Sequence, residues 1–578
     1  MTGVPSRRLR DPAAVAATAL RRHWLAAILI TAGLVLRILA QIAYQPALLY
    51  VDTLKYLYSA YPNSDPVGYK VPLRLILLVG NLNTVTAIQH LLGLATAIGL
   101  YVILLRRGTP RWLAALAIAP ILLDAYQLQI EQTIMPDVWF EALIVAGLAA
   151  LLAAPGPTSG TAAATRAPDT ASDVAATPTA PRSADDVAAA TPASGPAGST
   201  TAASSAPRLA STVRARLARA NARSGLPAII AAGLVLGASA TLRQVGEILI
   251  LPALIYLVAL WGGWQQVFTR SVALIAAFAI PVFAYSAGSL LISGHFWLAG
   301  ATPSVTSYGR MAAAADCATL RLPAYERALC PTARQRAFGQ DWLDHDIHSP
   351  FKAFVPPAGM NRFAVIAAFD HAVLAQQPGR VLAAVADDGI KLFALTRTSS
   401  QGGTPISRWQ FQDFYPTYPN WITISHGTII VGLPQTDGTM KYQPLTAAYG
   451  GAPQVDRPVA AALRRYQRDG GYTPGPLMLI FVLAGLAGSL LVLRRRAPRA
   501  DRRLAAACLL FFGGGIAVLV MSDVFQFTWR YQLPALVTLP PAGALGIAAI
   551  AGYRRKRPAD RQADEQRDEM PELAAPAL

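Results

Sequence analysis

Charged residues are scarce in this chain, and their scarcity excludes a single soluble globular fold. Only 14% of its 578 residues are charged, 53% are hydrophobic, and the mean hydropathy is +0.37. This apolar surface is far larger than one soluble core can bury. The chain is therefore predicted to be an all-α membrane protein that crosses the bilayer many times.

Cysteine is rarer still, with three residues, so the chain can form no more than one internal disulfide. Cys317 and Cys330 lie in a long insertion that we place outside the membrane, where disulfides persist, and we predict that they pair. Cys508 lies within an apolar run and is expected to be inert packing.

Apolar runs long enough to cross about 30 Å of hydrocarbon, at about 1.5 Å per residue, predict ten spans. The first run lacks a small-residue cleavage site and is followed by further runs, so we expect a span and not a cleaved signal peptide. The ten are expected at residues 25–44, 85–105, 112–127, 138–154, 227–241, 247–264, 272–293, 475–493, 504–521 and 531–552.

The excess of 50 basic over 32 acidic residues indicates the orientation of the chain rather than a nucleic-acid partner. Arginine clusters precede the first span, join the second to the third and the eighth to the ninth, and follow the tenth. This distribution is typical of the cytoplasmic side of a membrane. We therefore expect a multi-pass protein of the plasma membrane (the bacterial inner membrane) with both termini in the cytoplasm.

Two insertions divide the chain. Residues 155–225 are rich in Ala, Thr, Pro, Ser and Gly, which predicts a disordered cytoplasmic linker. Residues 295–473 predict a small mixed α/β domain outside the membrane, with a strand pattern at 421–431 and amphipathic helices at 363–374 and 379–395. The other parts are spans one to four in 1–154, with a first outer loop at 45–84, spans five to seven in 226–294, spans eight to ten in 474–553, and a charged cytoplasmic tail at 554–578.

Acidic residues gather on the outer side. Asp52 directly follows the first span, and the second outer loop, residues 124–137, holds three acids and no base. Carboxylates at the membrane surface suit a general base, a metal site or both. Asp52 is therefore a candidate base, and Asp52, Asp137 and Glu131 are candidate ligands of a divalent metal ion. The alternatives are solvated loop acids and, for Asp137, a carboxylate at a helix N-terminus.

Two arginines lie in short outer loops, against the trend for basic residues to lie inside. Arg243 and Arg530 are candidates for binding an anion, because a guanidinium group grips phosphate oxygens with paired hydrogen bonds. The alternative for each is an ion pair, of Arg243 with Glu247 or of Arg530 with Asp523.

Further polar residues follow the first span or lie within it. Lys70, Tyr56 and Tyr69 are additional candidates for binding the substrate or its phosphate. Arg37, within the first span, is expected to snorkel outward or to pair with a neighbouring acid.

The order of the predicted spans and loops, and the membrane side predicted for each loop, resemble the GT-C superfamily of membrane glycosyltransferases. This superfamily includes protein O-mannosyltransferases and the aminoarabinose transferases of lipid A. The shared features are an acid in the first outer loop, amphipathic segments before the second span and a second acidic loop. The matching pieces extend through the membrane part from end to end. They are Asp52-Thr-Leu-Lys-Tyr56, Gly68-Tyr-Lys-Val-Pro72-Leu73, Glu131 through MPDVWFEAL, Leu242-Arg243 with Gly246 and Pro252, and Trp529-Arg530-Tyr531 with Pro534.

The resemblance implies a GT-C-like fold and transfer of a sugar from a polyprenyl-phosphate carrier to a hydroxyl of a glycan, lipid or protein acceptor, by an inverting displacement. It gives Asp52 the role of the catalytic carboxylate. Lys70 falls where aminoarabinose transferases have a lysine before a proline, which implies a phosphate ligand. Thr53 follows Asp52, so the acidic pair of some members is missing here. We identify no acceptor-binding module of the family in the outer insertion.

Two other classes remain open. A lipid or glycan transporter, or flippase, also has many spans, but its ionisable residues usually lie near the bilayer midplane and its halves often repeat. Here the acids lie at one face, and no repeat is evident. A non-catalytic envelope assembly protein would explain the outer insertion, but it gives no reason for Asp52 to lie near Lys70 and an acidic loop.

Overall fold

The computed structural model describes most of the chain and is predominantly helical. The described residues are 18, 20–58, 66–154, 225–260, 263–296, 298, 303–399, 403–435, 439–494 and 499–568. The linker predicted at 155–225 lies outside these ranges except for its last residue, and the tail predicted at 554–578 lies outside them from residue 569 onward. Both therefore stay predictions.

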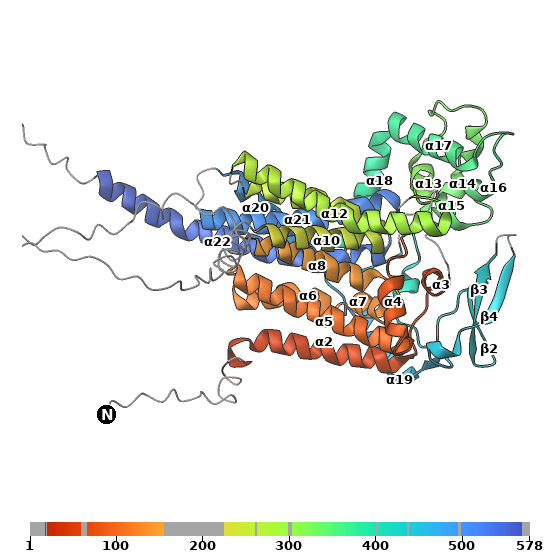
Figure 1. Ribbon diagram of the computed structural model, residues 1–578, viewed down its shortest axis with the longest axis horizontal. Helices are drawn as coiled ribbons and strands as arrows, with labels where there is room; N and C mark the ends of the chain where they lie inside the picture. The colour runs from red at the N-terminus through yellow and green to blue at the C-terminus, as the bar shows by residue number, and fades with distance from the viewer. Residues whose placement is uncertain are drawn as a thin grey trace, which may run out of the picture.

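Six described helices are long and apolar enough to cross a membrane, and they lie side by side along the long axis of the molecule (Figure 1). They correspond to the predicted spans one, two, seven, eight, nine and ten. They are α2 (Trp24–Ala43), α5 (Leu82–Arg106), α12 (Trp264–Ser293), α20 (Gly475–Leu490) with η6 (Leu491–Leu493), α21 (Arg499–Phe525), and η7 (Trp529–Gln532) with α22 (Pro534–Asp568).

The other four predicted spans are helical but short or bent, so the count of ten spans is not confirmed. The third is broken into two helices that meet at 53° and that form at most one span together. The break lies at Asp124, where the span predicted at 112–127 overlaps the acidic loop predicted at 124–137. The segments are α6 (Arg111–Leu123) with α7 (Ala125–Glu131), α8 (Asp137–Ala153), α10 (Leu226–Leu242), and η1 (Gln244–Leu249) with α11 (Ile250–Ala259).

The break between α6 and α7 has a clear physical cause. Asp124 is extended, ends α6 and caps the first turn of α7 with its side chain. The buried Arg37 of α2 donates to the carbonyl oxygens of Ile121 and Leu122, which the break frees, at 3.0 Å each. Arg37 also forms an ion pair of 2.7 Å with Glu131. Of the two expectations for Arg37, pairing with an acid is therefore the one observed.

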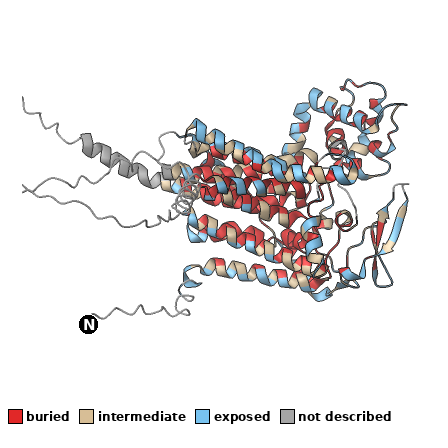
Figure 2. Cartoon of the chain, viewed as in Figure 1, coloured by how far each residue is buried: buried red, intermediate tan, exposed pale blue. Residues whose placement is uncertain are grey.

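Buried residues concentrate in the middle of the helical block (Figure 2). The largest core cluster joins α5, α6, α8, α10, α21 and α22. In contrast, only 11% of the most apolar stretch of α12 is buried, against 56% for α21. An apolar helix that stays exposed on this scale is expected to face lipid.

The outer insertion contains a helical cluster at the end of the block (Figure 1). It includes the predicted Cys317–Cys330 disulfide, which packs against a buried core of its own. The two amphipathic helices expected here are present as α17 and α18. The helices of the insertion are α13 (Pro303–Ala314), η2 (Glu326–Leu329), α14 (Ala333–Phe338), α15 (Gln340–His345), α16 (Pro350–Ala353), α17 (Arg362–Gln376), α18 (Pro378–Ile390), η3 (Lys391–Phe393), η4 (Ile406–Trp409), η5 (Ala447–Tyr449) and α19 (Arg457–Arg468).

Two small sheets complete the insertion. β2 (Ile422–Ser425), β3 (Thr428–Pro434) and β4 (Met440–Pro444) form an antiparallel sheet in that order. The strand pattern predicted at 421–431 is therefore two strands, joined by a tight turn at His426 and Gly427, both with positive φ as such hairpins require. β1 (Tyr44–Gln45) pairs with β5 (Gln454–Val455). This pairing ties the end of the first span to the insertion.

Candidate active site

Four chain segments bring predicted polar residues together at the end of the block that carries the outer insertion (Figure 1). α3 (Val51–Leu57) follows α2 and holds Asp52 in its first turn. α8 begins at Asp137, directly after Pro136. Arg243 lies at the junction of α10 and η1, and Arg530 lies in η7.

Local hydrogen bonds fix the position of Asp52. The Tyr50 backbone N–H donates to the Thr53 hydroxyl at 3.0 Å, which starts α3. The same hydroxyl donates to the Ile134 carbonyl oxygen at 3.1 Å. Thr53 therefore ties α3 to the loop that leads into Asp137.

Arg530 lies at the centre of the site. Its Nη1 donates to Oδ2 of Asp52 at 2.8 Å, and its Nε lies 3.2 and 3.1 Å from the two carboxylate oxygens of Asp137. The side chains of Arg530 and Asp137 are 5% and 1% exposed, whereas that of Asp52 is 30% exposed. Of the two carboxylates that Arg530 contacts, Asp52 is thus the one that stays partly exposed.

Arg243 extends the ion-pair chain. Its Nη1 pairs with Oδ1 of Asp137, and its guanidinium carbon lies 4.6 Å from the centre of the Tyr531 ring. Arg243 therefore pairs with Asp137 and not, as the alternative had it, with Glu247. The other alternative, Arg530 with Asp523, is also not observed: Asp523 accepts a hydrogen bond from Gln532 instead, at 2.8 Å.

A cavity of about 110 Å³ lies beside these groups. Asp52, Arg243 and Arg530 line it on the polar side, and Met521 and Phe525 of α21 line it on the apolar side. Because α21 is long and apolar enough to cross a membrane, one wall of the cavity belongs to a candidate membrane span. A molecule with a polar head and an apolar chain would suit such a cavity.

The surroundings of Asp52 keep it ionised. Burial raises the pKa of the Asp52 carboxyl, but Lys55 and Arg530 lower it more strongly, so the pKa is below its ordinary value. Asp52 is therefore a carboxylate at neutral pH and is paired with Arg530. If this ion pair weakens, the pKa of Asp52 rises and the carboxylate accepts a proton more readily.

The structure does not bring Lys70 into this cavity. α4 (Lys70–Leu77) turns Lys70 and Arg74 toward a separate groove that Tyr449 also lines. Tyr69 is fully buried and donates to Gln89 at 2.7 Å, and its ring contacts the Tyr56 ring edge-on. Of Lys70, Tyr56 and Tyr69, the predicted substrate ligands of this segment, Tyr56 lines the cavity.

The three predicted metal ligands do not form a metal site. Glu131 pairs with Arg37 at 2.7 Å and with His90 at 2.9 Å, in a separate buried cluster. Asp52 and Asp137 are already neutralised by Arg530 and its neighbours. Among the described residues there is no group of three or more His, Cys, Asp or Glu side chains that could hold a metal ion. These side chains therefore do not fit a divalent cation.

Lys55 was not predicted as a site residue. Its Nζ lies 3.7 Å from Oδ1 of Asp52, and it lines the cavity. The signal was available, since residues three apart on a helix lie on the same face. A helix starting at Val51 places Lys55 next to Asp52.

A second ion pair, from the outer insertion, supports η7. Both Nη atoms of Arg397 donate to the Asp124 carboxylate, at 3.1 and 2.7 Å. The Arg397 guanidinium carbon lies 5.1 Å from the centre of the Trp529 ring, and the Thr398 carbonyl oxygen accepts from the Trp529 indole at 2.9 Å. Because Trp529 is directly before Arg530 in η7, these contacts restrain the backbone that carries the site arginine.

No family model matches the sequence, and no curated protein matches it. Structures of the Archaeoglobus fulgidus oligosaccharyltransferase are distantly similar to this chain.

Three of these structures illustrate the degree of similarity. Archaeal oligosaccharyltransferase AglB in complex with an inhibitory peptide and a dolichol-phosphate is 12% identical, with a TM-score of 0.35, over 97% of this chain and 53% of the other. The form tethered with an acceptor peptide containing the NVT sequon is 12% identical, with a TM-score of 0.36, over 92% of this chain and 50% of the other. The apo form is 11% identical, with a TM-score of 0.35, over 94% of this chain and 52% of the other. The chain thus spans about half the length of these proteins.

Proposed function

We propose that this chain is an integral membrane glycosyltransferase of the GT-C type. It transfers a sugar, hexosyl or pentosyl, from a polyprenyl-phosphate carrier to a hydroxyl of an acceptor outside the membrane. The observation that supports this proposal is the ion-pair chain Asp52–Arg530–Asp137–Arg243 beside a cavity with one apolar wall. It combines a partly exposed carboxylate with two arginines at the membrane end, where the phosphate of a lipid carrier would lie.

The charge balance of the site favours an anionic ligand. Three basic side chains, Lys55, Arg243 and Arg530, surround two carboxylates, Asp52 and Asp137. Three positive and two negative charges leave a net charge of +1. A phosphate in the cavity would supply the missing negative charge and accept hydrogen bonds from the guanidinium groups.

Donor binding would also prepare the base. Arg530 holds Asp52 through Nη1, and this contact helps to keep the pKa of Asp52 below its ordinary value. A phosphate oxygen that approaches Arg530 offsets part of its positive charge, so the pKa of Asp52 rises toward its usual range. Asp52 then becomes a better general base when the donor is present.

The transfer itself is a single displacement at the anomeric carbon of the sugar. The acceptor oxygen forms a bond to this carbon while the bond from the carbon to the phosphate oxygen breaks. Asp52 takes the acceptor proton, and the electron pair of the broken bond stays on the lipid phosphate. Arg243 and Arg530 stabilise this charge. No general acid is needed, because the phosphate is already a good leaving group, and attack from the opposite side inverts the configuration.

The location and the acceptor belong to the same proposal. The pattern of basic residues supports a site on the outer face of a bacterial plasma membrane, with both termini in the cytoplasm. The outer insertion packs beside the site through Arg397 and Trp529, which is a suitable place for a glycan, lipid or protein acceptor of the cell envelope to bind.

Donor binding tests the proposal. Purified full-length protein in lipid nanodiscs is titrated with a synthetic polyprenyl phosphate, and Arg243→Gln is compared with Arg465→Gln, which changes an exposed arginine of α19. A hydrogen bond to a charged group contributes about 1.5–3 kcal/mol, so Arg243→Gln should bind about ten- to a hundredfold more weakly. Arg465→Gln should bind like the wild type. Equal affinities would remove Arg243 from phosphate binding.

The same preparation separates a transferase from a transporter. Lipid-linked sugars extracted from the source membranes are supplied with an envelope extract, and mass spectrometry follows loss of the sugar from its carrier. The wild-type protein should release the bare carrier. If the carrier crosses the bilayer and keeps its sugar, the transporter alternative is supported instead.

A further inference from the structure

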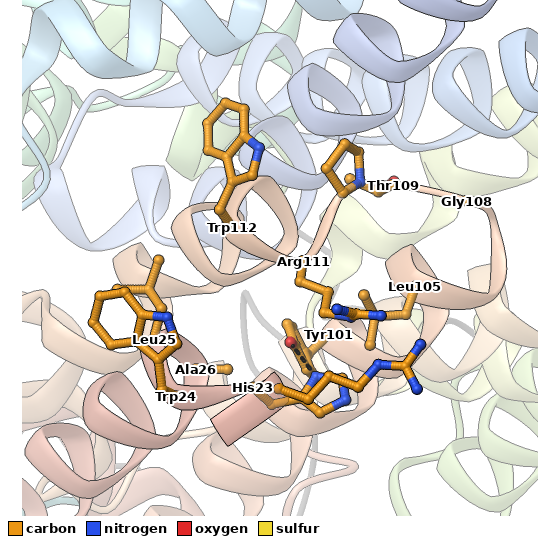
Figure 3. Close-up of a pocket in the computed structure, with 12 residues that line it drawn as sticks. His23, Trp24, Leu25, Ala26, Tyr101, Leu105, Gly108, Thr109, Arg111 and Trp112 are labelled. Atoms are coloured by element: carbon orange, nitrogen blue, oxygen red, sulfur yellow. Dashed lines mark hydrogen bonds between the residues drawn. The ribbon is translucent and has the colours of Figure 1, made fainter. Parts of the chain in front are cut away.

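A second cavity lies beside the start of α2, the end of that helix away from Asp52, and Figure 3 shows the residues that line it. Its volume is about 670 Å³, and it lies between the start of α2, the end of α5 and the loop that leads into α6. α2 has 20 residues, which places the two cavities about 30 Å apart along the helix. The proposed reaction does not use this second cavity.

The cavity is cationic. Arg22, Arg111 and His23 line it, and no carboxylate is among the described residues of its lining. Neither arginine forms an ion pair with a residue that the structure describes. His23 is held by a hydrogen bond of 2.8 Å between its Nδ1 and the Tyr101 hydroxyl, drawn as a dashed line in Figure 3. The cavity therefore presents basic groups that other parts of the described chain leave unneutralised.

A buried hydroxyl and a helix start lie in the wall of the same cavity. Thr109, which lines it, is 4% exposed, and its Oγ1 has no hydrogen-bond partner among the described residues. α6 begins at Arg111 without a side-chain cap, and Pro110, Arg111 and Trp112 all line the cavity. A buried polar group without a partner is costly, and the free N–H groups at a helix start attract anions. Both features favour an anionic ligand.

Two tryptophans indicate the depth of the cavity in the membrane. Trp24 and Trp112 line it, and each is 59% exposed. Trp24 begins the apolar helix α2, and Trp112 is the second residue of α6. Exposed tryptophans at the ends of apolar helices lie at the level of the lipid headgroups. The anions present in quantity at that level are lipid phosphates.

We propose that this cavity binds the phosphate headgroup of an anionic phospholipid, in the leaflet opposite the proposed active site. The arginines would bind the phosphate oxygens, the Thr109 hydroxyl would donate to one of them, and the tryptophans would flank the glycerol region. The proposal does not depend on the reaction at Asp52.

Lipid binding by the purified full-length protein, measured by native mass spectrometry in detergent, tests the proposal. The probes are dioleoyl phosphatidylglycerol, dioleoyl phosphatidylcholine and glycerol 3-phosphate. The double variant Arg22→Gln with Arg111→Gln is compared with Arg106→Gln, which removes an exposed arginine from the same end outside the cavity lining. A basic residue near an anionic lipid is worth about a fivefold change in affinity. We expect the double variant to bind phosphatidylglycerol about 30-fold more weakly, and Arg106→Gln to bind it like the wild type.

A second variant keeps the test decisive if the double variant folds poorly. Thr109→Val removes the buried hydroxyl without changing charge or size, and it should weaken phosphatidylglycerol binding about fivefold. Three results would overturn the proposal: an equal loss in Arg106→Gln, which shows diffuse attraction; equal binding of phosphatidylcholine; or equal binding of glycerol 3-phosphate, which shows a site for a soluble phosphate.

Discussion

The coupling between Arg530 and Asp137 gives the sharpest stability prediction. In Arg530→Gln, Asp137 stays 1% exposed and keeps Arg243 as its remaining ion-pair partner. Removing one partner of a buried ion pair typically destabilises a protein by about 3–5 kcal/mol. Since Arg243 still offsets part of the Asp137 charge, we expect a loss of about 3 kcal/mol in the free energy of unfolding.

The double variant Arg530→Gln with Asp137→Asn shows whether the two residues act together. It removes the charge that the single change leaves unpaired, so its destabilisation should be smaller than the sum of the two single effects by about 1–3 kcal/mol. The free energy of unfolding is measured by denaturant titration of full-length protein in mixed detergent micelles, with Arg465→Gln as the control. Additive single effects would refute the reasoning.

Three further predictions concern the surroundings of the site. Serine at both Cys317 and Cys330 should lower the free energy of unfolding by about 3 kcal/mol, the value for a loop of this length; an unchanged value would show that the bridge is not a stabilising element. Burial, and to a smaller extent Arg74, lowers the pKa of Lys70 to about 8. The unfolded state therefore binds more protons between pH 8 and the ordinary range of lysine, so the Lys70 contribution to stability rises with pH there. The rate of modification by an amine-reactive label is measured for Lys70 and for the exposed Lys441 at pH 8 and at high pH. The rate at pH 8 divided by the rate at high pH should be larger for Lys70 than for Lys441. Equal ratios would contradict the lowered pKa of Lys70. Arg397→Gln leaves a buried aspartate unpaired and should cost about 3 kcal/mol of unfolding free energy, part of which Arg397→Lys should recover; identical values for the two variants would argue against the ion pair.

Sequence patterns identified the residues of the site better than their partners. Asp52, Arg243 and Arg530 stood out because polar residues at one face of a membrane need a reason. The pattern did not show that Asp137 lies between the two arginines, because Arg530 and Asp137 are 393 residues apart. Such a contact depends on how the helices pack, and one sequence contains no record of it.

The assignments of Glu131 and Lys70 show the limits of proximity in sequence. Glu131 lies six residues before Asp137, yet it faces Arg37 and His90, because α7 turns it into the core. Lys70 and Asp52 lie in the same predicted loop between the first two spans, but α4 carries Lys70 to another groove. The helix directions that separate these residues depend on tertiary packing.

The spans were predictable as helices but not as ten full crossings. A long apolar run in a membrane favours a helix, because a helix satisfies its own backbone hydrogen bonds. All ten predicted segments are helical. Apolar composition does not fix length or bending: Asp124 breaks one span, and α8 and α10 stop at 17 residues. Arg37 donates to the carbonyl oxygens that the break frees, and these contacts with α6 form only in the folded protein.

The most direct test of the central claim separates donor binding from transfer in Asp52→Asn. This change removes the anion that holds Nη1 of Arg530, while Asp137 still pairs with Arg530 and keeps it in place. We expect Asp52→Asn to bind polyprenyl phosphate at least as tightly as the wild type, and to release no sugar from lipid-linked donors. Asp387→Asn, an exposed aspartate of α18, should behave as the wild type in both assays. Sugar release by Asp52→Asn at the wild-type rate would contradict the role of Asp52 as the base.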